Sequence, residues 1–152
     1  MSKLYIFRMS MGDTVSSAAG DLVQKQIFES SPYGEKKYFI AMQPAAVWPK
    51  GKFFVKGAKN DNGEFISYIN LPILREIIFA LFILKKLSRI NYVFHYNSYF
   101  FSNLVITLFK HIFNYKSIVI MQDYRSGEMF SKKDLLADKL ASFFLPFFDG
   151  YI

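Results

Sequence analysis

The segment from Asn91 to Tyr124 constrains the fold more than any other, because it predicts two buried strands joined by a helix. Residues 91–96 are mostly aromatic or β-branched, which is the composition of a buried strand. Residues 117–121 form a second, almost wholly apolar run. Strands without polar alternation are buried on both faces, as in parallel sheets joined by crossover helices. The expected fold class is therefore α/β, with a Rossmann-like, mostly parallel sheet flanked by helices.

The helix between these strands is expected over about residues 99–113. Asn97-Ser98 precedes it and can cap its first turn, since either side chain can accept a hydrogen bond from a free backbone N–H group. Asn114 is the expected stop. Three apolar residues stand at four-residue spacing, which is typical of one face of an amphipathic helix: Leu104, Leu108 and Ile112.

The rest of the chain alternates between strands and helices in the same way. Strands are expected over residues 3–8, 37–42 and 65–69, and helices over residues 17–29, 70–87 and from 131 to Pro146. The helix over residues 70–87 has proline in its first turn, and its broad apolar surface indicates packing on both sides. Asp149 opens a further strand that the chain does not finish. Residues 1–152 are therefore interpreted as a single domain that is a fragment of a longer protein.

Composition excludes several classes of protein. The 152 residues are 52% hydrophobic, which is too apolar for a disordered segment. The absence of cysteine excludes a disulfide scaffold, and with only two histidines a zinc site is disfavoured, so no cofactor or metal is predicted. No secretory signal is recognised, and the longest uncharged apolar run, residues 77–84, is shorter than the about 20 residues that span a membrane. We expect a cytoplasmic protein, and the alternative is a protein attached peripherally to the inner face of the cell membrane.

Positive charge is concentrated in the first part of the chain. Residues 1–60 hold nine Lys/Arg against four Asp/Glu, whereas residues 61–152 hold ten against eight. A basic half favours a polyanionic partner, which can be nucleic acid, an anionic lipid surface or a phosphorylated ligand. Solubility and a lysine-rich composition explain the same charge without a partner, and both interpretations stay open.

The long segment from Pro44 to Gly63 also has two interpretations. Aromatic residues lie here among four lysines: Trp48, Phe53 and Phe54, with Lys50, Lys52, Lys56 and Lys59. Such residues suit an anionic membrane surface, and stacking on nucleic acid needs the same residue types. The structural alternative is a hairpin in which residues 52–56 and 64–68 pair across a turn at residues 60–63.

Polar residues follow the carboxyl ends of the predicted strands, where open parallel sheets bind their ligands. Tyr96-Asn97-Ser98 ends one strand, and Gln122-Asp123-Tyr124 ends the next. The first strand leads into a loop of small residues whose backbone N–H groups can face a phosphate: Gly12, Asp13, Ser16 and Ser17. This loop is neither a dinucleotide fingerprint nor a P-loop, and a tight helix start is the alternative.

The order of these elements carries a resemblance to a known family. The motifs that carry it are Asn70-Leu71-Pro72, Tyr96-Asn97-Ser98, Gln122-Asp123-Tyr124 and Phe148-Asp149-Gly150-Tyr151-Ile152. Together they resemble the N-terminal half of a GT-B glycosyltransferase, nearest to the large retaining family 4 that builds bacterial surface polysaccharides and glycolipids. The likeness covers nearly the whole chain, although its motifs are short.

The resemblance implies an enzyme that moves a sugar from a nucleotide-sugar donor to a saccharide or lipid-linked acceptor. It also implies that the donor is held mainly by a C-terminal domain that residues 1–152 do not include, so this fragment is expected to be inactive alone. No pair of carboxylates flanks a single residue at a strand end, which disfavours a metal-dependent transferase.

The same resemblance assigns roles to individual residues. Asp123 matches the strand end at which relatives place the polar residue that approaches the acceptor hydroxyl, and it is the expected catalytic residue. Asn97 and Ser98 match the acceptor side of the cleft, next to Tyr124 and Arg125, and Arg125 can meet a phosphate on a lipid-linked acceptor. The first loop matches one near donor phosphate and acceptor, but lacks the double glycine of many members: Gly12, Asp13, Ser16 and Ser17.

His95 and two rival functions complete the expectations. By strand alternation His95 points away from a cleft that Tyr96 or Asn97 faces, so it is interpreted as a core histidine.

The first rival function is a non-catalytic, membrane- and acceptor-binding subunit of a two-chain transferase, which a stop codon directly after the chain would favour. The second is a basic nucleic-acid-binding α/β module, whose binding would fall steeply with salt. No recognition motif supports the second, so no nucleic-acid partner is expected.

Overall fold

The structure of the 152-residue chain is a computed structural model. It describes residues 3–8, 29, 32, 36–43, 45–60, 63–96, 99–120, 136 and 139–151. In these residues the elements follow in the order β1 (Lys3–Arg8), β2 (Lys36–Ala41), β3 (Phe54–Val55), β4 (Ala58–Asn60), β5 (Gly63–Phe65), β6 (Tyr68–Ile69), α2 (Pro72–Leu87), β7 (Tyr92–Tyr96), α3 (Phe100–Phe113), β8 (Lys116–Ile120), η1 (Leu145–Phe147) and β9 (Gly150–Tyr151).

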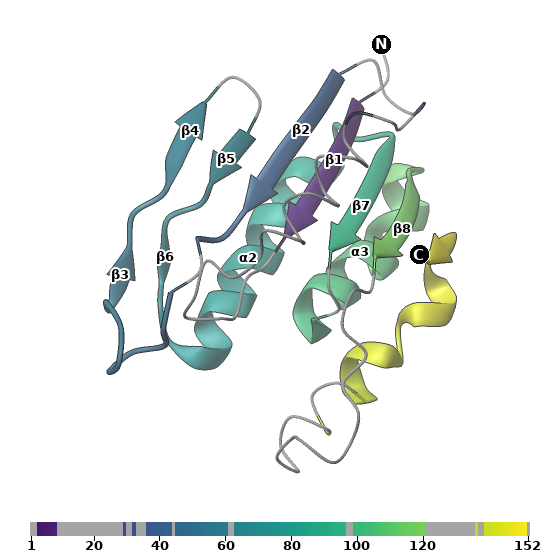
Figure 1. The fold of residues 1–152 in the computed structure, drawn as a ribbon. Helices are drawn as coiled ribbons and strands as arrows, with labels where there is room; N and C mark the ends of the chain where they lie inside the picture. The colour runs from purple at the N-terminus through teal and green to yellow at the C-terminus, as the bar shows by residue number, and fades with distance from the viewer. Residues whose placement is uncertain are drawn as a thin grey trace.

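Seven strands of the described chain form one sheet, in the order β4-β5-β2-β1-β7-β8-β9 (Figure 1). The neighbouring pairs are parallel except β4 and β5, which are antiparallel. Counted along the chain, the six parallel strands stand in the order 3-2-1-4-5-6, which is the strand order of Rossmann folds. The predicted Rossmann-like, mostly parallel α/β fold is thus confirmed.

The strands expected over residues 3–8, 37–42, 91–96 and 117–121 are present within one residue of those positions, whereas the strand expected over residues 65–69 is divided between β5 and β6. β1 covers residues 3–8 as predicted, and β2 is shifted by one residue. The central βαβ unit is β7-α3-β8, in which Tyr92 is paired with Lys116 and Tyr96 with Ile120. The strand expected after Asp149 is β9, which pairs in parallel with β8.

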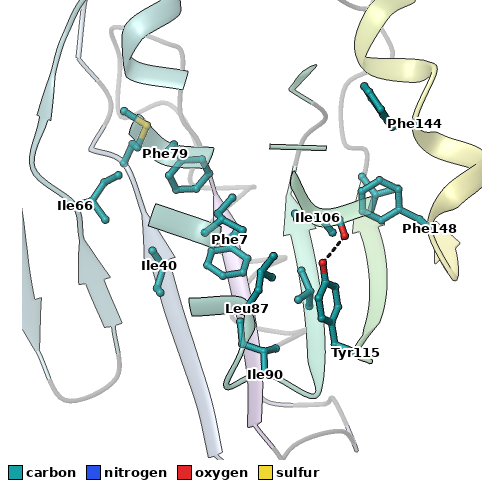
Figure 2. Packing of buried hydrophobic residues seen from close by; sticks show 14 of the residues in the cluster. Phe7, Ile40, Ile66, Phe79, Leu87, Ile90, Ile106, Tyr115, Phe144 and Phe148 are labelled. Atoms are coloured by element: carbon teal, nitrogen blue, oxygen red, sulfur yellow. Dashed lines mark hydrogen bonds between the residues drawn. The ribbon is translucent and has the colours of Figure 1, made fainter. Parts of the chain in front are cut away.

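α2 and α3 lie side by side on one face of the sheet (Figure 1). On the strands, alternate residues Phe7, Val93 and Val119 point to this face and pack with Phe79 and Ile106 of the helices. Figure 2 shows this packing, with the Tyr115 hydroxyl donating a hydrogen bond to the Ile106 carbonyl oxygen. The opposite face carries a second buried cluster: Leu4, Ile6, Phe94, Tyr96 and Ile120. Both faces of the central strands are therefore buried, as their apolar runs predict.

The segment over residues 52–69 folds back on itself, as the hairpin interpretation predicts. β4 pairs with β5 in antiparallel register, and β3 pairs with β6. The pairing differs from the predicted one, because residues 52–56 contribute only β3 and β4 lies beyond them, while residues 64–68 are shared between β5 and β6. Gly57 lies at the interruption between β3 and β4. A side chain there would place its Cβ 2.0 Å from the Phe65 carbonyl oxygen, so this close approach requires glycine. The turn residues Asp61 and Asn62 lie outside the described residues.

α3 begins and ends close to its predicted bounds, but it buries a different face. It ends at Asn114, whose φ of 50° is left-handed, as the expected stop requires. Leu108 and Ile112 from the predicted apolar stripe are 60% and 67% exposed. The buried residues are instead Ser102, Asn103, Ile106 and Thr107.

This rotation of α3 is helped by hydrogen bonds that two of its inward polar side chains make. Asn103 Nδ2 donates to the Ala141 carbonyl oxygen over 3.0 Å, and Thr107 Oγ1 donates to the Asn103 carbonyl oxygen over 2.8 Å. Buried polar groups with partners cost little, so the polar face can be the inner one. The pattern of apolar residues in the sequence does not show which polar side chains will find hydrogen-bond partners inside the fold.

α2 ends at Leu87 as predicted and begins at Pro72, two residues later than expected, but it is not packed on both sides. Its buried residues include Phe79, Ile83 and Leu87, which face the sheet and α3. Ile73 and Leu81 are exposed. A helix that covers one face of a sheet meets the strands and its neighbouring helix, and its outer side stays open unless a further layer is added.

The predicted first and last helices are described only in part. Glu29, the last residue of the helix expected over residues 17–29, is helical. Residues 136 and 139–142 are helical as well, and the helix gives way to η1 at Leu145, with Pro146 at its start. Phe144 and Phe148 pack against the core from this segment (Figure 2). Among the described residues, no helix combines the length and apolarity that crossing a membrane requires.

Asp149 fixes the end of the chain to β8 and α3. Its carboxylate lies 2.9 Å from Lys110 Nζ and accepts a hydrogen bond from the Ser117 N–H group over 2.7 Å. Burial by itself would raise the pKa of Asp149, but these hydrogen bonds and the charges of Lys110 and Lys116 together hold it below its usual range. This carboxylate thus serves to dock β9.

The orientation of α3 leads to a testable prediction. Ile106→Ala removes a fully buried side chain and should lower the free energy of unfolding by about 2–5 kcal/mol. Leu108→Gln changes an exposed position and should alter it by less than about 0.5 kcal/mol. Urea denaturation of both variants measures the difference. A loss in Leu108→Gln as large as that in Ile106→Ala would contradict the described orientation.

Candidate functional site

The strand order singles out one edge of the sheet as the place for a ligand. The chain runs from β1 to β2 and β5 on one side, and then returns to β7, β8 and β9 on the other. The order therefore reverses between β1 and β7, which are direct neighbours. In open parallel sheets, ligands bind beyond the carboxyl ends of the strands at such a reversal. The candidate site is thus the region beyond Arg8 and Tyr96.

The predicted site residues all follow strand ends at this edge. Arg8 is paired with Tyr96, and Tyr96 is paired with Ile120, so the ends of β1, β7 and β8 are aligned. The predicted residues come directly after these ends in the sequence: Gly12, Asp13, Ser16 and Ser17 after β1, Asn97 and Ser98 after β7, and Asp123, Tyr124 and Arg125 after β8. They lie outside the described residues, so their positions and roles stay predictions.

The described rim of this edge is built by the starts of α2 and α3. The N-cap of α3 is Tyr99, which makes no side-chain capping bond. Asn97 and Ser98, the predicted cap, lie outside the described residues. The free N–H group of Phe101 is bound by Glu76 of α2, whose Oε1 accepts it over 2.8 Å. A carboxylate from one helix thus caps the next. The cap is a tertiary contact and leaves no local signal next to α3.

Glu76 belongs to a pair of adjacent charged residues at the start of α2. Burial raises the pKa of Glu76, against the opposing effects of the Phe101 hydrogen bond and the Arg75 charge. Arg75 is almost fully buried, and burial lowers its pKa, against the opposing effects of nearby Tyr68, Tyr99 and Glu76. Its Nη1 atom donates to the Asn70 side-chain oxygen and the Ala45 carbonyl oxygen over 3.4 and 3.5 Å.

Asn70 connects this rim to the segment before β3. It is completely buried, and its Nδ2 atom donates to the carbonyl oxygens of Ala46 and Lys52 over 2.6 and 3.0 Å. Its backbone N–H group donates to the Phe53 carbonyl oxygen, and its carbonyl oxygen accepts from the Trp48 N–H group. Sequence reasoning noted Asn70 as a helix start and as part of a family motif, and it did not single out Arg75 or Glu76. A buried Asn-x-Pro helix start with two charges after it is a weak signal that could have marked them.

His95 lies outside the candidate site, as strand alternation predicts. It is completely buried on the face of β7 that α3 covers, beside Asn103. Burial lowers the pKa of His95 to about 3, and hydrogen bonding with the Asn103 side chain opposes this shift. The imidazole is therefore neutral at physiological pH and belongs to the core.

Within the described residues, no three His, Cys, Asp or Glu side chains are grouped so as to hold a metal ion. A scan against protein-family models found no family that matches the chain, and a search of curated proteins found no similar sequence.

The contact between Glu76 and α3 predicts a contrast between two substitutions. Glu76→Gln keeps an acceptor for the Phe101 N–H group and removes a buried charge, so stability at pH 7 should equal or exceed that of the wild type. Glu76→Ala removes the acceptor and should cost about 1 kcal/mol. Because the pKa of Glu76 is raised in the folded state, its ionised carboxylate destabilises the fold above that pKa. This destabilisation fades as the pH falls and the carboxylate is protonated. Thermal unfolding between pH 4 and 7 measures this, and equal losses in both variants would contradict the capping role.

Burial of His95 predicts acid sensitivity. Its folded pKa of about 3 lies below its ordinary value of 6.5, so the folded state binds fewer protons between these pH values. Stability should therefore fall as the pH drops below about 6.5, with a slope of up to about 1.4 kcal/mol per pH unit from this group. His95→Gln keeps a polar partner for Asn103 and cannot titrate, so its stability should depend less on pH. Identical pH dependence in both proteins would exclude this role for His95.

Proposed function

We propose that the chain is the acceptor-binding, N-terminal-type domain of a GT-B glycosyltransferase. Such an enzyme moves a sugar from a nucleotide-sugar donor to a saccharide or lipid-linked acceptor. The observation that carries the proposal is the aligned register of β1, β7 and β8 at the reversal of strand order. Each of these strands is followed by one of the polar segments that the family resemblance assigns to the cleft.

In this proposal Asp123 acts on the acceptor hydroxyl. β8, which precedes it, is held in the sheet between two neighbouring strands and therefore gives a rigid support. The carboxylate accepts a hydrogen bond from the hydroxyl, orients its oxygen towards the anomeric carbon of the donor sugar and helps to remove its proton. The bond to the nucleoside diphosphate breaks as the new glycosidic bond forms, and the diphosphate leaves with the electron pair.

The other predicted residues position the two substrates. Asn97 and Ser98 would bind hydroxyl groups of the acceptor, and Tyr124 would line the same side. Arg125 would pair with a phosphate when the acceptor is attached to a lipid diphosphate. The loop after β1 would approach the donor phosphate through its backbone N–H groups. The nucleotide itself is assigned to a second domain, on the same polypeptide or on a partner chain.

Asp123→Asn tests the catalytic role. The substitution keeps the shape of the side chain and removes its charge, so the rate of sugar transfer should fall about 10²–10⁴-fold, the usual contribution of a positioned acid–base group. The assay uses the chain together with the donor-binding domain, a nucleotide-sugar donor and lipid-linked acceptors. Circular dichroism confirms that the variant is folded.

The controls distinguish catalysis from stability. If Asp123 only caps the loop that follows it, the Asn variant keeps a rate near that of the wild type, and Asn97 becomes the next candidate. Residues 1–152 alone should transfer no sugar, because the donor is assigned to the second domain. Turnover of any activated sugar by residues 1–152 alone would contradict this division of roles.

A further inference from the structure

A group of exposed aromatic and basic side chains lies beyond the carboxyl ends of β2 and β5. We call it the aromatic tip, and it consists of Trp48, Phe53 and Phe54 with Lys50, Lys52 and Lys56. The three aromatic side chains are 48%, 51% and 54% exposed, and the three lysines are exposed beside them. Large aromatic side chains that are half exposed in a group, rather than singly, indicate a surface that contacts something else.

The aromatic tip is held in place from both of its ends. Asn70, itself completely buried, is hydrogen-bonded to the backbone of Ala46, Trp48, Lys52 and Phe53. Between them the chain turns tightly at Gly51, where a Cβ atom would lie 1.9 Å from the Ala46 carbonyl oxygen. The side chains are thus presented by an ordered backbone, so little conformational entropy is lost when they bind.

The charge of this segment has a single sign. Residues 45–60 contain four lysines and neither aspartate nor glutamate. Lysine ammonium groups beside aromatic rings are suited to the headgroup region of a bilayer, where the rings lie at the apolar boundary and the cations meet lipid phosphates.

The geometry of the rings favours lipid over nucleic acid. Trp48 and Phe53 pack edge to face, with ring centroids 6.0 Å apart and an interplanar angle of 80°. Successive bases of a single strand stack on ring faces. An edge-to-face pair gives an apolar wedge rather than two parallel platforms. The exposed Ile73 and Leu74, at the start of α2 just after Asn70, extend the surface with side chains that cannot stack at all.

We propose that the aromatic tip docks the protein on an anionic lipid bilayer, with Trp48 and Phe53 inserted at headgroup depth. The proposal does not depend on sugar transfer, since it uses none of the residues assigned to the acceptor or the donor. It specifies a partner chemistry and the residues that recognise it.

Trp48 is the only tryptophan of the chain, so its fluorescence reports on the tip directly. The 152-residue protein is titrated with vesicles of phosphatidylcholine alone and with vesicles containing about one third phosphatidylglycerol. With the anionic vesicles we expect a blue shift of the emission, protection from acrylamide and quenching by lipids brominated near the headgroup. Binding should weaken as the salt concentration rises, because the lysine contribution is screened.

Matched variants separate the tip from the overall charge. Lys50→Gln, Lys52→Gln and Lys56→Gln should each weaken vesicle binding about fivefold, and together about a hundredfold. The control combines Lys36→Gln, Lys85→Gln and Lys139→Gln, three exposed lysines elsewhere, and lowers the formal net charge of +7 by the same amount. It should bind at least tenfold more tightly than the tip variant. Phe53→Ser should reduce the blue shift while leaving all lysines in place.

Three outcomes would overturn the proposal. The first is that both lysine triples weaken vesicle binding equally, which would assign binding to net charge. The second is that Trp48 emission does not change while the protein floats with the vesicles, which would place the contact elsewhere. The third is that Trp48 is quenched by a single-stranded oligonucleotide and is unaffected by vesicles, which would assign the tip to nucleic acid. Circular dichroism and thermal unfolding confirm that each variant is folded.

Discussion

The central strands β1, β7 and β8 are stable only when both of their faces are covered, because apolar side chains project from each face. On one face this cover comes from α2 and α3, which pack Phe79 and Ile106 against the strands. α3 returns the chain from the end of β7 to the start of β8, so the two strands pair in parallel, and parallel pairing brings the carboxyl ends of the strands to one edge. The location of the candidate site is therefore a consequence of how the strands are buried.

The start of α2 makes several connections at that edge among the described residues. Asn70 is bonded to the segment before β3, Arg75 to Asn70 and Ala45, and Glu76 to the first turn of α3. Buried charged and amide groups are costly unless they have partners, and here backbone groups supply many of them. One helix start thus fixes the positions of two segments that are far apart in the sequence. The first turn of α3 is held in place by a residue of another helix.

The aromatic tip and the candidate site lie at the same end of the sheet, where β1 and β2 have their carboxyl ends. Figure 1 shows β3, β6 and the start of α2 on the side towards which the arrows of β1 and β2 point. A lipid-linked acceptor has its saccharide next to the bilayer surface, so a domain that contacts lipid on this side would hold its acceptor site close to that surface. The two proposals are therefore compatible in geometry, although each is tested without the other.

Much of the fold could be predicted from the amino-acid sequence, because local pattern is enough for buried strands and for helix ends. The apolar runs of β1, β7 and β8, the stop of α3 at Asn114 and the proline at the start of α2 are examples. The predicted site could be located only to a sheet edge, since its residues follow strands whose ends are aligned by register.

The sequence by itself determined the fold class, most element bounds and the burial of His95, since these follow from periodicity and strand alternation. Only the tertiary structure decided which face α3 buries, because Asn103 finds its partner at Ala141, far along the chain. The same holds for the capping of α3 by Glu76 and for the fixing of the aromatic tip by Asn70. These contacts join residues distant in sequence, and a polar side chain is stable inside a protein only where the fold supplies its partner.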